Sequence, residues 1–133
     1  MKLSYKMWLD HNGRAFGYGP AHLLEGVEHW GSLRKAAQEL GMSYNKAWRI
    51  VHAAEQRLGF ALLDRTVGGS LGGGSILTPE AQDLMRRYRA MVGDVDDALT
   101  AVFARHFGDW VHPGPAELPP VPPDEPPSET PGG

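Results

Sequence analysis

Apolar residues recur at the spacing of an amphipathic helix in four stretches of this chain. The predicted helices cover residues 20–30, 33–40, 44–58 and 78–107. Each of the last three begins at or after a residue that can cap a helix N-terminus: Ser32, Ser43 and Thr78. The first three each run into a glycine, which adopts a left-handed backbone at low cost: Gly31, Gly41 and Gly59. Local signals therefore define most of these helix ends.

Two pairs of short segments have the pattern of β-hairpins. Residues 3–9 alternate in character and run into the turn cluster 10–13, and residues 14–19 are their expected partner. Residues 62–67 and 76–78 flank a glycine-rich connection and predict a second hairpin. The sequence therefore predicts a mainly α fold with a small β component.

The C-terminal part of the chain differs in composition from the rest. Nine of the 11 prolines fall between Pro113 and Pro131, and from Gly108 onward there are five acidic residues and no Lys or Arg. A segment with so few large apolar residues cannot offset the entropy lost on ordering. We therefore expect a disordered, acidic, proline-rich tail over residues 108–133 and one domain over residues 1–107. The domain has 13 basic against 11 acidic residues, or +2, although the whole chain carries −3.

Several classes of function find no support in the sequence. The 133 residues include no cysteine, which excludes disulfides, thiolate metal sites and cysteine nucleophiles within this chain. The six histidines have no metal-ligand spacing with a carboxylate, and no Ser/His/Asp set stands out. No apolar run has the length of a membrane span, and the N-terminus has no signal-peptide core. We expect a cytoplasmic protein that is not an enzyme, holds no metal and contacts no membrane.

Residues 31–51 match a helix-turn-helix, in which two helices cross at a tight turn. Ala37 supplies the small residue where the helices touch, and Gly41 supplies the positive φ of the turn. Apolar residues take the interior positions: Ala36, Leu40, Met42, Ala47 and Ile50. Because these requirements are independent of one another, the pattern is specific.

The outward side of the third predicted helix carries residues suited to DNA: Tyr44, Asn45, Lys46 and Arg49, with His52 at the rim. Asparagine can bond adenine with two hydrogen bonds, and Lys or Arg can bond guanine. Nearby basic residues are better placed for phosphates: Arg34, Lys35 and Arg65. The glycine-rich hairpin predicts a wing, because glycine lets the backbone approach the sugar–phosphate edge closely. It does not match a phosphate-binding loop, since no Gly-Lys-Ser/Thr follows.

The fourth predicted helix carries an apolar seam. Its members follow the 4-3-4-3-4 spacing of a coiled coil: Leu84, Tyr88, Met91, Val95, Ala98 and Val102. Gly93 lies inside this helix and weakens it by about 1 kcal/mol.

Three motifs stand out along the domain: Gly31-Ser32, then Gly41-Met42-Ser43-Tyr44-x-x-Ala47-Trp48, then Arg65-Thr66-x-Gly68-Gly69-x-x-Gly72-Gly73-Gly74-x-x-Leu77-Thr78. Together they resemble the N-terminal domain of ModE-type molybdate-responsive regulators, a winged helix related to the DNA-binding domain of LysR-type regulators. The resemblance covers roughly residues 3–105. The Ser-Tyr-x-x-Ala-Trp run and the long glycine wing are specific to the ModE-type branch.

The resemblance implies a winged helix-turn-helix transcription factor that binds double-stranded DNA as a homodimer, paired through the long helix after the wing. The candidate DNA-binding residues are Ser32, Lys35, Ser43, Tyr44, Asn45, Lys46, Arg49, Arg65, Thr66, Gly69, Gly72 and Gly73. The candidate dimerisation residues are Leu84, Tyr88, Met91, Val95, Leu99 and Val102. Trp48 matches a position that we expect to lie mainly in the core.

Full-length members of that family continue into a β-rich domain that binds molybdate or tungstate, and here the acidic tail stands in its place. We therefore expect a regulator of molybdate- or tungstate-related genes that holds no cofactor in this chain. One alternative is a single-domain oxyanion sensor that binds the anion at its wing or dimer interface and signals through a partner. Another is an interaction module that docks a partner through its tail.

Overall fold

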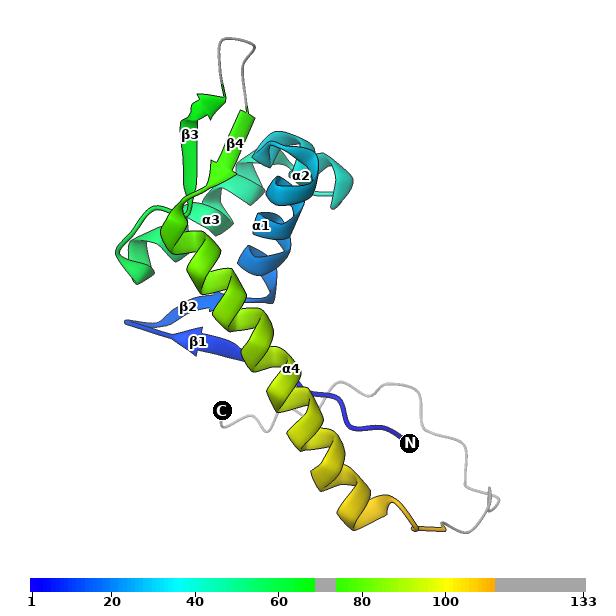
Figure 1. The fold of residues 1–133 in the computed structure, drawn as a ribbon. Helices are drawn as coiled ribbons and strands as arrows, with labels where there is room; N and C mark the ends of the chain where they lie inside the picture. Colours follow the sequence, from blue (N-terminus) through cyan, green and yellow to red (C-terminus); the bar gives the residue numbers. More distant parts are fainter. Residues whose placement is uncertain (69–73, 112–133) are drawn as a thin grey trace, which may run out of the picture.

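Three short helices and two small hairpins form the body of the protein, and a long fourth helix runs away from it (Figure 1). The computed structural model describes residues 1–68 and 74–111. The elements in chain order are β1 (Trp8–Asp10), β2 (Arg14–Gly17), α1 (Tyr18–Trp30), α2 (Leu33–Glu39), α3 (Tyr44–Leu58), β3 (Leu63–Gly68), β4 (Gly74–Leu77) and α4 (Pro79–Phe107). The predicted mainly α fold with a small β component is confirmed.

Hydrogen bonds at the helix ends confirm the predicted caps. The side-chain hydroxyl oxygen of each predicted N-cap accepts a bond from the backbone N–H three residues later, at 3.0 to 3.1 Å: Ser32, Ser43 and Thr78. Gly31 and Gly59 follow α1 and α3 with φ of 86° and 87°. Glycine is favoured there because a side chain would strain this backbone.

The core lies where α1, α3 and the beginning of α4 meet β2. Its largest fully buried side chains include Phe16 of β2, Leu23 and Leu24 of α1, and Met85 of α4. Tyr88 of α4 is only 7% exposed, and its ring lies edge-on to Phe16 with the centroids 5.2 Å apart. Burial raises the pKa of the Tyr88 phenol. The first part of α4 therefore belongs to the core of its own chain.

The N-terminal strand is shorter than predicted. β1 begins at Trp8 and pairs antiparallel with the four-residue β2, so residues 3–7 find no partner strand among the described residues. Leu3 and Tyr5 lie instead near the second half of α4, where the Tyr5 hydroxyl donates to Asp96 Oδ1 at 2.7 Å. Apolar side chains of the two segments line a shared pocket: Met1, Leu3, Leu99 and Phe103. The alternation at residues 3–9 therefore reflects packing on a helix as well as strand pairing.

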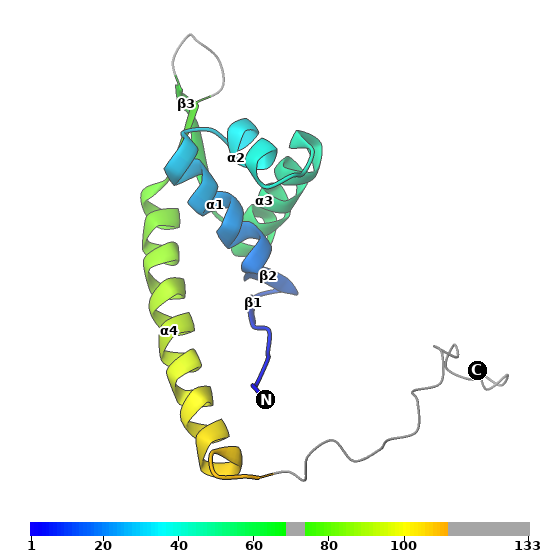
Figure 2. The same ribbon diagram turned by 90° about the vertical axis from the view of Figure 1, so that its right-hand side faces the viewer.

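The second predicted hairpin is present, with β3 antiparallel to β4 and Leu63 opposite Leu77 at its base. The backbone N–H of Ser75 donates to the carbonyl of Gly31 at 3.0 Å, which ties the hairpin to the end of α1. The hairpin, α2 and α3 lie at one end of the molecule, opposite the C-terminal end of α4 (Figure 2). The predicted wing glycines lie outside the described residues: Gly69, Gly72 and Gly73.

The first residues of the predicted tail continue from α4. The backbone N–H of Gly108 donates to the carbonyl of Ala104 at 2.9 Å. The Trp110 ring lies edge-on to Phe107 with the centroids 5.5 Å apart. Gly108 and Trp110 therefore contact the helix end, whereas Val111 is 89% exposed. The rest of the predicted tail, residues 112–133, lies outside the described residues.

Candidate nucleic-acid interface

The turn between α2 and α3 has the geometry of a helix-turn-helix. Gly41 has φ of 73°, and the backbone N–H of Met42 donates to the carbonyl of Ala37 at 3.0 Å. The chain therefore turns tightly at the C-terminal end of α2, and only the four residues 40–43 separate α2 from α3. Small buried side chains fill the crossing: Ala36, Ala37 and Ala47. The predicted helix-turn-helix is confirmed.

Three predicted DNA-binding side chains are exposed on α3, namely Asn45, Lys46 and Arg49. None of the three forms a side-chain hydrogen bond or ion pair with any other residue that the structure describes. The opposite side of the helix carries its buried residues: Ala47, Val51 and Ala54. The polar side of α3 therefore keeps its amide and cationic groups available to a partner.

Tyr44, predicted on the same side, is half-buried beneath a basic side chain. The guanidinium of Arg34 on α2 lies 4.3 Å from the centroid of the Tyr44 ring, a cation–π contact. This contact holds a positive charge beside the N-terminal end of α3. The next residue, Lys35, forms an exposed ion pair with Glu39, with Nζ 3.3 Å from Oε1.

The helix-turn-helix is locally basic although the whole chain is acidic. Residues 32–52 contain four basic and one acidic residue, whereas the chain carries a net charge of −3. A basic surface attracts the phosphate backbone of a nucleic acid through counterion release. The charge of this motif is therefore of the sign that such a partner requires.

Ser32 and Ser43 cap the N-terminal ends of α2 and α3. Their hydroxyl oxygens accept hydrogen bonds from backbone N–H groups at 3.0 and 3.1 Å, which satisfies donors that a helix leaves unpaired. Each hydroxyl still has its own proton, which it can donate to a phosphate oxygen. The structural role of both serines is thus observed, while their contact with DNA stays a prediction.

Trp48 is not in the core, and the expectation that it would be is wrong. Its side chain is 37% exposed, and its ring stacks on the imidazole of His52 with the centroids 4.5 Å apart. The physical reason is its position on α3: Trp48 lies one residue beyond Ala47, about 100° around the helix from that buried side chain. A residue at this offset lies at the border between the buried and the exposed side of the helix, where periodicity alone does not decide its burial.

The predicted wing residues Arg65 and Thr66 lie in β3. Figure 2 shows that β3 and α3 lie at the same end of the molecule. The structure therefore brings the backbone of the hairpin and the helix-turn-helix to one end, as a winged helix requires.

Four of the predicted dimerisation residues already have contacts within their own chain. Tyr88 is buried, and Leu84 and Met91 pack against the core from its edge. Leu99 lines the pocket beneath the N-terminal segment. The spacing of a coiled-coil seam therefore serves, in this part of α4, to pack the domain as well.

The exposed apolar surface of α4 lies near its C-terminal end. Val95 is half-buried, and Val102 is 38% exposed. Beyond them Phe103 stacks on Phe107, with the ring centroids 5.5 Å apart, and Trp110 packs on Phe107 in turn. This end of α4 therefore offers apolar side chains that the rest of the described chain does not cover.

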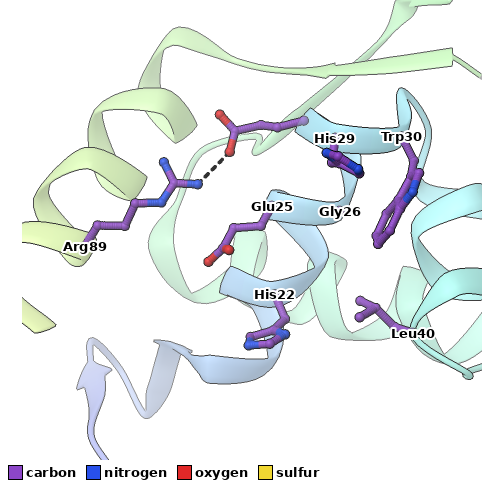
Figure 3. A pocket seen from close by; sticks show the side chains of 8 residues that line it. His22, Glu25, Gly26, His29, Trp30, Leu40 and Arg89 are labelled. Carbon is purple, nitrogen blue, oxygen red and sulfur yellow. Dashed lines mark hydrogen bonds and ion pairs between the residues drawn. The ribbon is translucent and has the colours of Figure 1, made fainter.

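An open pocket of about 720 Å³ lies along the outer side of α1. Figure 3 shows Arg89 of α4 reaching toward α1, where its Nη2 is 2.7 Å from Glu28 Oε1. Glu25 adds a second carboxylate to the same pocket. The lining thus holds two carboxylates against one arginine, which does not favour an anion here. The oxyanion-sensor alternative places its anion at the wing or the dimer interface, so it stays a prediction.

Within residues 1–68 and 74–111 no group of three or more His, Asp or Glu side chains is arranged to hold a metal ion. None of the helices there combines the length and the apolar content needed to cross a bilayer.

The fold and its exposed basic helix define a winged helix-turn-helix protein. Residues 21–82 match the family described as bacterial regulatory helix-turn-helix proteins of the lysR family. This range runs from α1 through the hairpin to the first turn of α4. Residues 21–82 therefore carry a helix-turn-helix that is similar to those of LysR-type regulators.

Three bacterial proteins are similar to the chain over 50% to 70% of its length. The chain is 33% identical over 93 residues to the molybdenum-pterin-binding protein MopB of Rhodobacter capsulatus, a match that covers 70% of this chain and 34% of that protein. It is 36% identical over 69 residues to the molybdenum transport protein ModE of Herbaspirillum seropedicae, covering 52% and 26%. It is 35% identical over 66 residues to the DNA-binding transcriptional dual regulator ModE of Escherichia coli strain K12, covering 50% and 25%. The match thus spans about a quarter to a third of these relatives, and the resemblance to ModE-type regulators is confirmed.

Proposed function

We propose that this chain is a sequence-specific DNA-binding transcription regulator. One observation carries the proposal: a LysR-type helix-turn-helix exposes Asn45, Lys46 and Arg49 on α3 without partners among the described residues. Residues at the start of a recognition helix read base edges in the major groove, and amide and guanidinium groups do so with paired hydrogen bonds. Relatives whose names describe transcriptional regulators support a role in regulation and not in catalysis.

Basic side chains around α3 would add affinity without reading the sequence. Arg34 is held over Tyr44 at the start of α3, and Lys35 is exposed on α2. Both lie on the helix that precedes the recognition helix, which in this motif crosses the DNA backbone. We therefore assign Arg34 and Lys35 to phosphate contacts.

We further propose that the protein acts as a homodimer paired through α4. This helix has 29 residues, or about 43 Å at 1.5 Å per residue, and its C-terminal end exposes Val102 and Phe107 beyond the core. Pairing of two copies would bury these side chains. To reach successive major grooves, the two copies of α3 would have to lie about 34–36 Å apart in the dimer.

The relatives favour genes of molybdenum metabolism as targets. The names of two of them refer to the binding or transport of molybdenum. We propose that this chain regulates genes related to molybdate or tungstate through its DNA site.

Selection from a random-sequence DNA pool tests the proposal. The full chain is incubated with the pool, bound duplexes are amplified over several rounds, and the enriched duplex is then treated with nuclease in the presence of the protein. We expect one enriched, pseudo-palindromic site with two protected segments about 10 bp apart. A pool whose composition stays unchanged over the selection would refute sequence-specific binding.

A further inference from the structure

Trp48 presents an apolar ring beside the polar side of α3. Its indole is 37% exposed, whereas tryptophan is highly buried on average. Asn45 lies about one turn before it and Arg49 directly after it, and both are exposed. The indole therefore borders the surface that the proposed function assigns to DNA.

His52 supports the indole from behind. The two rings stack with an interplanar angle of 15° and centroids 4.5 Å apart. His52 Nδ1 lies 3.7 Å from Glu55 Oε1, and Glu55 Oε2 accepts a hydrogen bond of 2.7 Å from the backbone N–H of Leu62. This series of contacts links the indole to the chain just before β3. A side chain held in this way loses less entropy when it meets a partner.

The rings of Tyr44 and Trp48, both on α3, differ in how far other side chains cover them. The Tyr44 ring packs against the core and beneath the Arg34 guanidinium. Among the described residues, the Trp48 ring stacks on that of His52 alone, and more than a third of its surface stays exposed. Among the aromatic side chains of α3, it is therefore Trp48 that has apolar surface to offer a ligand.

We propose that Trp48 contacts the C5-methyl group of a thymine in the major groove and that His52 is its positioning residue. This inference rests on the proposed DNA binding. The base edges in the major groove carry donors and acceptors, and the thymine methyl is the apolar group among them. Packing this methyl on the indole removes apolar surface of both from water, a gain that no other base edge provides. Trp48 thereby adds a preference for thymine next to the bases that Asn45 and Arg49 face.

The test compares two forms of one duplex selected by the full chain from the random-sequence pool. One form carries thymine and the other carries deoxyuridine, which pairs identically and lacks only the methyl group. From the usual gain for burying one methyl group, the unmodified protein should bind the deoxyuridine form about fourfold more weakly for each contacted methyl. The Trp48→Gln variant should bind both forms equally. The Trp8→Gln variant is the control, because it removes an exposed indole on β1, outside both α3 and the proposed dimer contact, and should keep the fourfold ratio.

Two further variants test the role of His52. His52→Ala removes the stacked ring and should lower the ratio of the two affinities toward one. His52→Phe keeps a stacked ring and should restore the fourfold ratio. Because each ratio compares two duplexes on the same protein sample, a partly unfolded variant changes both affinities alike and leaves the ratio intact.

The possible results distinguish a failure of this inference from a failure of the proposed DNA binding. Equal affinity of the unmodified protein for both duplexes would overturn the inference, as would a ratio that survives in Trp48→Gln or a selected site without thymine. In each of these cases the proposed DNA binding stands. If no duplex is selected at all, the proposed function fails and the inference fails with it.

Discussion

Gly26 of α1 faces Ala36 of α2 so closely that no side chain fits between the two helices. A Cβ atom placed on Gly26 would lie 2.7 Å from the Cβ of Ala36 and 3.2 Å from the ring of Trp30. Ala36 is fully buried, and its Cβ cannot move without its helix. The contact between these two residues therefore sets how α2 lies on α1, and α2 in turn supports α3.

Replacing Gly26 with alanine should push α1 and α2 apart. We expect Gly26→Ala to lower the free energy of unfolding by about 1–2 kcal/mol, because the clash outweighs the gain in helix propensity. Gly93→Ala is the matched control, since nothing lies within 4 Å of the added methyl group on α4. It should raise the free energy of unfolding by about 0.5–1 kcal/mol. Urea denaturation measures both, and a Gly26→Ala protein as stable as the original would contradict the contact.

A second prediction separates the capping role of Ser43 from its proposed place at the DNA. Asparagine and aspartate both cap helices well, so Ser43→Asn and Ser43→Asp should unfold within about 0.5 kcal/mol of the original protein. Only Ser43→Asp adds a negative charge close to the proposed phosphate path, so it alone should bind the selected duplex more weakly. Thermal denaturation and a mobility-shift titration check the two effects. Equal DNA affinity of the two variants would place Ser43 away from the DNA.

A third prediction concerns Lys35, which we assign to a phosphate. Lys35→Ala should reduce the slope of log affinity against log salt concentration by about 1 per protomer. Glu39→Gln breaks the same ion pair but leaves the cation in place, so it should keep the full slope. Fluorescence anisotropy at several salt concentrations measures the slope. An unchanged slope in Lys35→Ala would exclude this phosphate contact.

A fourth prediction tests pairing through the C-terminal end of α4. Val102→Glu puts a charge into the proposed apolar contact, and the protein should sediment as a monomer at concentrations where the original chain is a dimer. Ala104→Glu is the control, because Ala104 is exposed two residues later, about 200° around the helix, and faces away from that contact. Analytical ultracentrifugation gives both masses. Dimers of equal stability in both variants would place the interface elsewhere.

Much of the fold could be predicted because its signals are local. Ser43 caps α3 and Gly59 ends it through contacts that involve only three or four neighbouring residues, so the helix ends follow from sequence. The helix-turn-helix follows in the same way, because the small residue, the glycine and the apolar positions all lie within 21 residues.

The structure departs from the predictions at positions where one spacing of apolar residues fits two different kinds of packing. Apolar residues at 4-3-4 intervals suit a coiled coil as well as a core, and Tyr88 is buried in the core because Phe16 lies across from it. Alternation at residues 3–7 suits a strand as well as a segment lying on α4. Trp48 lies at the border between the two sides of α3, where helical periodicity assigns neither burial nor exposure. These positions depend on neighbours that are distant in sequence.

The most direct test of the account is a paired titration of the selected duplex with Arg49→Ala and Arg105→Ala. Both variants remove one arginine and so change the net charge equally, but Arg49 lies on the exposed side of α3 and Arg105 near the C-terminal end of α4. If α3 enters the major groove, Arg49→Ala should bind about 5- to 100-fold more weakly while Arg105→Ala binds as the original chain does. Equal affinities in the two variants would contradict recognition of DNA by α3.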